Sequence, residues 1–243
     1  MAEAFAWGAL ASSSLLFGAV IALRVKVGKL ALGLVMAFGS GVLISAVAYE
    51  LALEAAEVAD GTGAAAAGLF AGSITFFAGD ALIDRYGGAQ RKHSGGGQKS
   101  GTALAIVLGI VLDGVPESMV IGLSLLSGEG VSAAVIVAVF LSNLPESIAA
   151  TTGLKASGWS GGKIIGLWTL VVAVSGLAAL AGRGLLADAS PGTIAFVLAF
   201  AGGAILTMLA DTMMPEAFEH GGKLVGLLTT LGFALAFAVS AFE

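Results

Sequence analysis

Apolar residues dominate eight stretches of the chain, and polar residues gather in the short connections between them. A helix of about 20 apolar residues is long enough to cross the hydrocarbon core of a bilayer. Each stretch reaches that length, so the pattern predicts an all-α membrane protein in which residues 1–243 form one transmembrane domain. The eight predicted transmembrane helices lie near 4–23, 30–54, 63–84, 102–127, 131–154, 162–182, 191–217 and 222–242.

Basic residues fall almost entirely on alternate connections of this eight-helix arrangement. Arg183 lies on one side, and all other lysines and arginines lie on the opposite side. Because Lys and Arg are enriched in cytoplasmic loops, that basic side is predicted to be cytoplasmic and both termini non-cytoplasmic. The Gly-rich segment 87–101 is predicted to be a cytoplasmic loop. The basic positions on the cytoplasmic side are Arg24, Lys26, Lys29, Arg85, Arg91, Lys92, Lys99, Lys155, Lys163 and Lys223.

Composition agrees with a membrane location and excludes several functions. The chain is 58% hydrophobic and 11% charged, less than half of the roughly one-quarter charged content of soluble domains. The 37 glycines favour close helix packing in lipid. The sequence has no cysteine, which excludes disulfides and thiolate metal sites, and its net charge of −5 offers no basic patch for nucleic acid. The absence of a targeting segment favours the plasma (inner) membrane of a bacterium or archaeon as a multi-pass protein.

Two internal similarities predict an inverted repeat of three, two and three helices. Residues 37–41 in the second predicted helix match residues 199–203 in the seventh, and Glu54 matches Glu216 at the same offset. Residues 112–118 in the fourth helix match residues 141–147 in the fifth. Both pairs join helices that run in opposite directions. Secondary transporters commonly bind substrate at the interface of such repeats, on interrupted helices near the middle of the membrane.

The central pair of helices concentrates oxygen-bearing side chains beside prolines. Pro116 and Pro145 each lack an amide hydrogen and free a backbone carbonyl four residues earlier. Asp113 and Glu117 share one helix face because they are four residues apart. The side chains predicted to converge are Asp113, Glu117, Ser142, Asn143 and Glu146.

Carboxylates at membrane depth favour a cation path. Such groups are expensive in lipid and by default mark ion pathways or proton relays. Neither central helix offers a lysine, arginine or histidine between residues 102 and 154. A cation from outside the chain would neutralise the acids; alternatively, they are protonated and make structural hydrogen bonds between helices. Asp211, in the seventh helix, is predicted to line the same path, and His220 is either an exit-side ligand or a helix-terminal histidine that serves the dipole.

These residues resemble the ZIP (Zrt/Irt-like) metal-ion transporters over nearly the whole chain. The resemblance rests on the paired Pro-Glu motifs of helices four and five, the loop after helix three and the segment 210–217. It implies a first metal site at Asp113, Glu117, Ser142 and Glu146, and a second at Gly114, Asn143, Glu117 and Glu146. It also implies a homodimer.

The chain departs from the family at several of its ligand positions. Asp113 and Ser142 stand where typical members have histidine, and Gly114 stands where they have asparagine. No counterpart of the family's helix-six glutamate is found within 162–182, so the second site is predicted to be dismantled. Oxygen ligands suit harder cations than the zinc that histidine favours.

The expected function is inward transport of a divalent metal ion (zinc, manganese, iron or cadmium) across the lipid bilayer, with no prosthetic group. One alternative is a ZIP-fold protein that has lost metal transport and moves another solute or protons, or acts as a sensor. An intramembrane enzyme would need an activated nucleophile or a metal-hydrolase set, and Ser118 and Ser147 have no histidine within their helices. A purely structural subunit would not account for the duplicated acidic motif.

Overall fold

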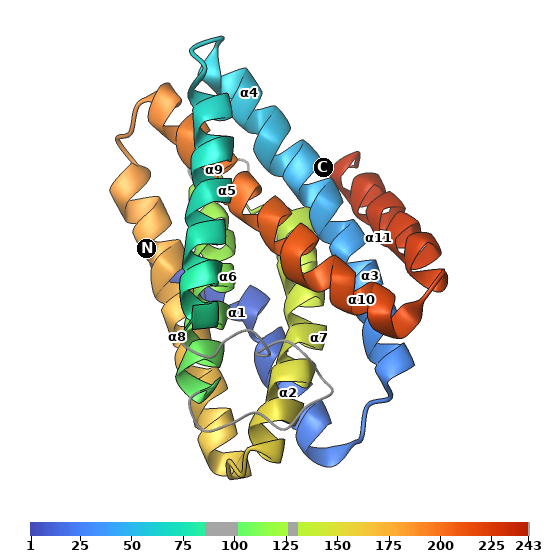
Figure 1. Cartoon of the computed structure of the whole chain (residues 1–243). Helices are drawn as coiled ribbons and strands as arrows, with labels where there is room; N and C mark the ends of the chain where they lie inside the picture. The colour runs from blue at the N-terminus through green and yellow to red at the C-terminus, as the bar shows by residue number, and fades with distance from the viewer. Residues whose placement is uncertain (86–101, 126–130, 243) are drawn as a thin grey trace.

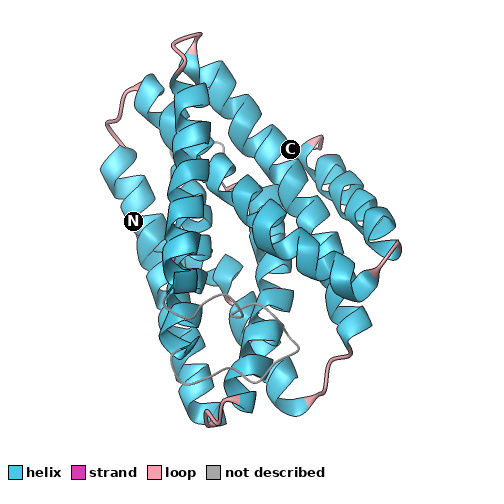
Figure 2. Ribbon diagram, in the orientation of Figure 1, coloured by secondary structure: helices cyan, strands magenta, loops and turns pink. Residues whose placement is uncertain are grey.

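In a computed structural model of the chain, residues 1–85, 102–125 and 131–242 are described, and these residues form helices joined by short turns (Figure 2). The described residues contain no β-strand. The predicted loop 87–101 and its His93 lie outside the described residues. The all-α class predicted from the apolar pattern is therefore confirmed for the part of the chain that the structure covers.

Each predicted apolar range coincides with one helix or with consecutive helices. The first range holds two helices that meet at Ser13, and the second and seventh ranges each contain a π-helical segment between two α-helices. The elements are α1 Ala2–Ser12, α2 Ser14–Arg24, α3 Lys29–Ala46, η1 Val47–Leu53, α4 Glu54–Ala59, α5 Ala64–Ile83, α6 Thr102–Ser124, α7 Ala133–Ala156, α8 Gly161–Leu186, α9 Pro191–Met208, η3 Leu209–Met213, α10 Met214–Gly221 and α11 Leu224–Ser240.

Six helical runs among the described residues are long and apolar enough to cross a membrane. They are 2–24, 29–59, 64–83, 135–156, 161–186 and 191–221, while α11, at 17 residues, is a shorter apolar helix. These lengths support the membrane-embedded character of the protein. The count of eight spans and the non-cytoplasmic placement of the termini stay predictions.

Local sequence signals explain where several helices begin and end. Ser132, Ser160 and Ser190 each accept a hydrogen bond from the backbone N–H three residues later, at the starts of α7, α8 and α9. Asp60 ends α4 in a left-handed conformation, with φ of 44°, and aspartate tolerates that region better than most residues. The helices α6 and α7 continue through Pro116 and Pro145.

The helices pack as two units that contact each other, and their elements are labelled in Figure 1. In the first unit, α1 and α2 lie against α7 and α8, and α6 packs on α8. In the second unit, α3 packs on α11 and α10, and α9 packs on α5 and α4. The units meet where α3 contacts α7 and where α9 contacts α6. The α3–α4 run rises from the lower to the upper end of Figure 1, and the α9–α10 run descends.

The packing of α3 and α9 recurs at a fixed sequence offset. A Cβ added to Gly41 of α3 would collide with the carbonyl oxygen of Thr229 in α11, and one added to Gly203 of α9 would collide with that of Leu69 in α5. Gly41 and Gly203 are equivalent in the internal repeat found in the sequence. The π-helices η1 and η3 also begin at positions separated by that same offset. Backbone contact of this kind requires glycine because any side chain would push the helices apart.

Candidate functional site

The predicted site residues of α6 and α7 are buried in the first unit, near its contact with the second. The exposed fraction is 3% for Asp113, 2% for Glu117, 3% for Ser142 and 5% for Asn143, while Glu146 is half-buried. Asp113 and Glu117 are one helical turn apart on α6, as Ser142 and Glu146 are on α7. The motif residues thus occupy the interior of the molecule rather than its outer surface.

The polar atoms of α7 are positioned partly by its own backbone. Ser142 Oγ donates to the carbonyl oxygen of Val139 at 3.0 Å, and Ser147 Oγ donates to that of Leu144 at 2.9 Å. A serine hydroxyl that donates in this way keeps its lone pairs as acceptors for a cation or a donor.

The carbonyl that Pro145 frees lies against the second unit. A Cβ on Gly39 of α3 would stand 3.1 Å from the carbonyl oxygen of Leu141 and 3.4 Å from Cα of Ser142. Because residue 39 is glycine, the backbone of α3 approaches the interrupted part of α7 closely. The motif of α7 is therefore part of the contact between the two units.

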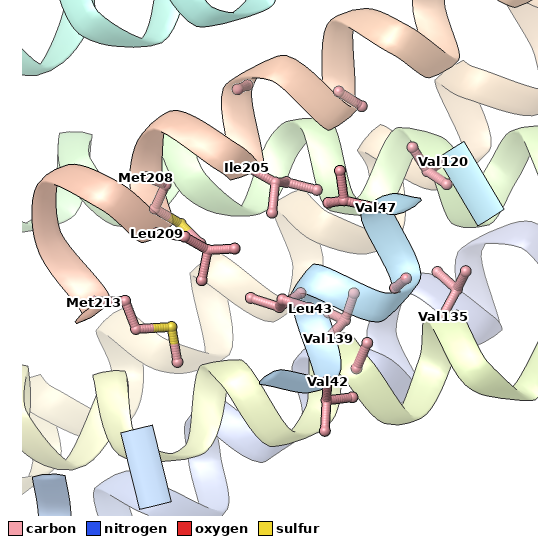
Figure 3. Packing of buried hydrophobic residues seen from close by; sticks show 14 of the residues in the cluster. Val42, Leu43, Val47, Val120, Val135, Val139, Ile205, Met208, Leu209 and Met213 are labelled. Atoms are coloured by element: carbon pink, nitrogen blue, oxygen red, sulfur yellow. The ribbon is translucent and has the colours of Figure 1, made fainter. Parts of the chain in front are cut away.

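A small cavity of about 20 Å3 adjoins Glu117, between α6, the beginning of α7, the end of α3 and η1. It is about large enough for one water molecule. Figure 3 shows the apolar side chains that surround this region, contributed by both units. Apart from Glu117, the lining residues are apolar: Leu43, Ala46, Val47, Leu51, Val120, Val135, Ala138, Val139 and Ile205. Apolar residues from both units thus surround the cavity beside Glu117.

A polar residue that the sequence analysis missed lies opposite Gly114. Ser175 of α8 is 3% exposed, and its Oγ would be 3.7 Å from a Cβ on Gly114. In the ZIP resemblance Gly114 takes the asparagine position and helix six should supply a glutamate. The structure brings the short hydroxyl of Ser175 to this place instead. The signal in the sequence was a single serine in an otherwise apolar stretch of α8.

Asp211 is placed apart from the buried residues of α6 and α7. It is exposed on η3, while the neighbouring Thr212 donates to the carbonyl oxygen of Met208 at 2.6 Å. The structure therefore does not bury Asp211 in the same interior region as Asp113 and Glu117.

At the lower end of the second unit, His220 and Glu216 form a buried pair. His220 Nε2 lies 3.8 Å from Glu216 Oε1, and their side chains are 5% and 3% exposed. A Cβ on Gly33 of α3 would approach Cβ of His220 to 2.7 Å, so the pair is packed against α3. This arrangement joins α10 to α3.

Within the described residues, no three His, Asp or Glu side chains form a cluster ready to hold a metal ion. Hydroxyl and amide oxygens are cation ligands as well as carboxylates. Ser142, Asn143 and Ser175 are buried residues of the same unit that carry such oxygens.

No model of a known protein family matches the chain, and no curated protein matches it. The ZIP resemblance accordingly rests on the motifs in the sequence.

Proposed function

We propose that the protein is a multi-pass membrane transporter of ZIP type that moves divalent metal cations toward the cytoplasm. The observation that carries this proposal is the burial of Asp113 and Glu117 beside Ser142 and Asn143, in a helix pair whose sequence motif is duplicated. Buried acids at membrane depth cost several kcal/mol in lipid and are retained mainly where they serve an ion path or proton relay.

The two-unit packing supports an inverted repeat with the motif helices at its centre. The α3–α11 contact corresponds to the α9–α5 contact, and the α2–α7 contact corresponds to the α6–α8 contact. Such repeats allow one unit to move against the other about a central site. In the proposed topology of eight spans, with both termini outside, the lower end of Figure 1 faces the cytoplasm.

The apolar packing above Glu117 supports a conformation that is closed toward the non-cytoplasmic side. The contact between the units on that side is made of aliphatic residues such as Leu43, Val135 and Val139. Hydrated cations do not cross a dry aliphatic contact, because stripping water from the ion costs far more than packing returns. Transport then requires the first unit to shift against the second, so that the carboxylates reach the other side.

The oxygen-rich donor set supports a preference broader or harder than that of a histidine site. Carboxylate, hydroxyl and amide oxygens suit manganese and other hard cations, and carboxylates also bind zinc. Binding to acids releases any protons that they hold, so affinity should fall as the pH is lowered. The proposed location of the protein is the plasma (inner) membrane, and its proposed assembly is a homodimer.

The test is uptake of manganese and zinc into proteoliposomes. Glu117→Gln with Glu146→Gln removes two carboxylates while keeping their size, and we expect uptake of both metals to fall at least tenfold. Glu57→Gln, an exposed change on α4, is the matched control and should leave uptake within twofold of the unaltered protein. Equal uptake by the double variant and the control would refute the site.

A second candidate function follows from Gly114, which departs from the ZIP pattern at a ligand position. With glycine there and only a serine hydroxyl opposite it, the second metal site lacks two of its donors. A protein of this fold could therefore have lost metal transport and carry another solute or protons, or act as a sensor. Metal binding without uptake in the same proteoliposomes would favour the sensor, and neither binding nor uptake would favour a different solute.

A further inference from the structure

We propose that the lower end of the first unit binds the headgroup of an anionic phospholipid. Three helix ends meet there: the end of α2, the end of α7 and the beginning of α8. Arg24, Lys26, Lys155 and Lys163 are all exposed at this end, which lies at the bottom of Figure 1. We call this group of four residues the basic end.

Leu23 brings the basic residues of the three helices together. Lys155 Nζ donates to the carbonyl oxygen of Leu23 at 3.2 Å, immediately before Arg24. The side chain of Leu23 lies within 3.7 Å of the Cβ position of Gly161, two residues before Lys163. The backbone segments that carry the basic residues of α2, α7 and α8 are therefore neighbours at this end. An ammonium group has three donor hydrogens, so Lys155 keeps two for a bound anion after this bond.

The charge at this end is of a single sign. From residue 13 to 28 and from 148 to 170, the described chain contains no acidic residue. The lower end of the second unit is different, because its Lys29 and Lys223 share that end with Asp84 and Glu219. Among the described residues, the first unit thus carries at this face a group of basic residues with no acidic residue in the adjoining segments.

The surroundings of the basic end suit a lipid rather than a free anion. Trp159 is half-buried beside it and packs with Leu23 against the apolar cluster of Leu154, Ile164 and Trp168. Tryptophan is enriched at the level of lipid headgroups, where its ring is partly apolar and its N–H is wet. Basic pockets between transmembrane helices on the cytoplasmic side bind anionic headgroups, and each basic residue contributes attraction. A phospholipid fits both the basic residues and the apolar cluster. Its phosphate would contact the basic residues, and its acyl chains would contact Trp159 and its apolar neighbours.

The experiment measures how brominated lipids quench Trp159 in reconstituted protein. Trp7→Phe with Trp168→Phe leaves Trp159 as the sole tryptophan of the chain. Vesicles contain phosphatidylcholine with brominated phosphatidylglycerol, or with brominated phosphatidylcholine at the same fraction. We expect brominated phosphatidylglycerol to quench Trp159 more strongly than brominated phosphatidylcholine does, and we call this difference in apparent affinity the preference for phosphatidylglycerol. Arg24→Gln with Lys163→Gln should reduce that preference about fivefold per removed charge.

The matched control removes two charges from the same membrane face of the second unit. Lys29→Gln with Lys223→Gln should leave the preference within twofold of the parent protein. An equal fall in both double variants would overturn the proposal, because it would show a diffuse attraction to an anionic surface. Loss of the preference on adding inorganic phosphate or glycerol phosphate would also overturn it, by showing a site for a free anion.

A second measurement uses the chain with its tryptophans intact, in case their replacement disturbs folding. In neutral detergent, short-chain phosphatidylglycerol should raise the unfolding midpoint more than short-chain phosphatidylcholine does. Arg24→Gln with Lys163→Gln should abolish the difference, and its persistence in that variant would overturn the proposal. The inference depends on the membrane-embedded fold and not on metal transport, so Glu117→Gln and Glu146→Gln should leave the lipid preference unchanged.

Discussion

The two units share a packing scheme but differ in what they bury. Of the buried polar residues in the described chain, ten belong to the first unit and three to the second. The second unit instead contains the π-helices η1 and η3 and presents aliphatic side chains to Glu117. The polar interior of the first unit therefore faces an apolar surface of the second. The ten residues are Ser12, Ser14, Asp113, Glu117, Ser118, Ser142, Asn143, Ser147, Thr151 and Ser175, and the three are Ser40, Ser45 and Glu216.

The largest expected effect tests the packing of the second unit. Gly41→Ala and Gly203→Ala each place a methyl group against a backbone carbonyl that cannot move without its helix. We expect each change to lower the free energy of unfolding by about 3 kcal/mol, the upper range for overpacking. Unfolding in mild detergent, followed by circular dichroism, measures the loss.

The control for this pair is Gly226→Ala in α11, where an added Cβ meets no atom within 4 Å. It should be neutral or slightly stabilising, because alanine favours helix more than glycine does. A similar loss of unfolding free energy in Gly41→Ala and Gly203→Ala would support the equivalence of these two positions in the repeat. A loss at only one of them would break the correspondence between α3 and α9.

Loss of a buried hydrogen bond in the first unit should lower the free energy of unfolding more than loss of a partly exposed hydrogen bond in the second unit. Trp168 Nε1 donates to Thr151 Oγ1 at 2.9 Å, and both residues are fully buried. Thr151→Val removes the acceptor while keeping the shape, which should cost about 2 kcal/mol because the indole N–H is left in an apolar core. In the second unit, Ser240 Oγ donates to Glu50 Oε1 at 2.6 Å near the end of α11.

The comparison variant is Ser240→Ala, which we expect to cost less than about 1 kcal/mol because water can replace the lost donor at a partly exposed carboxylate. Thermal unfolding of both variants under the same conditions gives the ranking. Equal losses for Thr151→Val and Ser240→Ala would contradict the contrast between a buried core and a rim.

Metal selectivity should respond to placing the histidine and asparagine donors of ZIP proteins in the first unit. A Cβ on Gly114 would lie 3.7 Å from Ser175 Oγ, an ordinary contact distance, so the Cβ of an asparagine at position 114 has space. Asp113→His with Gly114→Asn and Ser142→His should raise the preference for zinc over manganese about tenfold, because imidazole favours zinc. Competitive uptake of the two metals measures the ratio. An unchanged ratio would show that these three positions do not ligate the transported ion.

The smallest expected effect is at the surface of the first unit. Arg183 Nη1 lies 3.2 Å from Glu3 Oε2, and the Glu3 side chain is largely exposed. Arg183→Gln should change the free energy of unfolding by less than about 0.5 kcal/mol, as is typical of solvated ion pairs. Unfolding at low and high salt checks this, and a loss above about 1 kcal/mol would show that the pair is structurally important.

The helix ranges could be predicted from the sequence because a bilayer demands long apolar runs. The predicted range 162–182, for example, lies within α8, and 63–84 agrees with α5 to within a residue or two. The burial of Glu117 and Asn143 also followed from the proline motif alone. Both the helix ranges and the burial of the motif depend on residues that are close together in the sequence, so a single sequence contains the information that predicts them.

The environments of Ser175 and Asp211 could not be predicted from the sequence. Ser175 lies near Gly114 because α8 packs against α6. This is a tertiary contact between residues that are far apart in the sequence. Asp211 lies within η3, and the wider π-helical turn breaks the 3.6-residue periodicity from which side-chain directions are read. Nothing in the composition of residues 209–213 indicated that change of geometry.

The carboxylate site is tested most directly by metal binding to the purified protein, measured by calorimetry across manganese, zinc, iron, cadmium, magnesium and calcium. We expect at least one divalent cation to bind the parent protein and the Glu57→Gln control, and we expect Glu117→Gln with Glu146→Gln to abolish the binding. Binding that survives in the double variant, or no binding of any cation by the parent protein, would contradict a carboxylate metal site on α6 and α7.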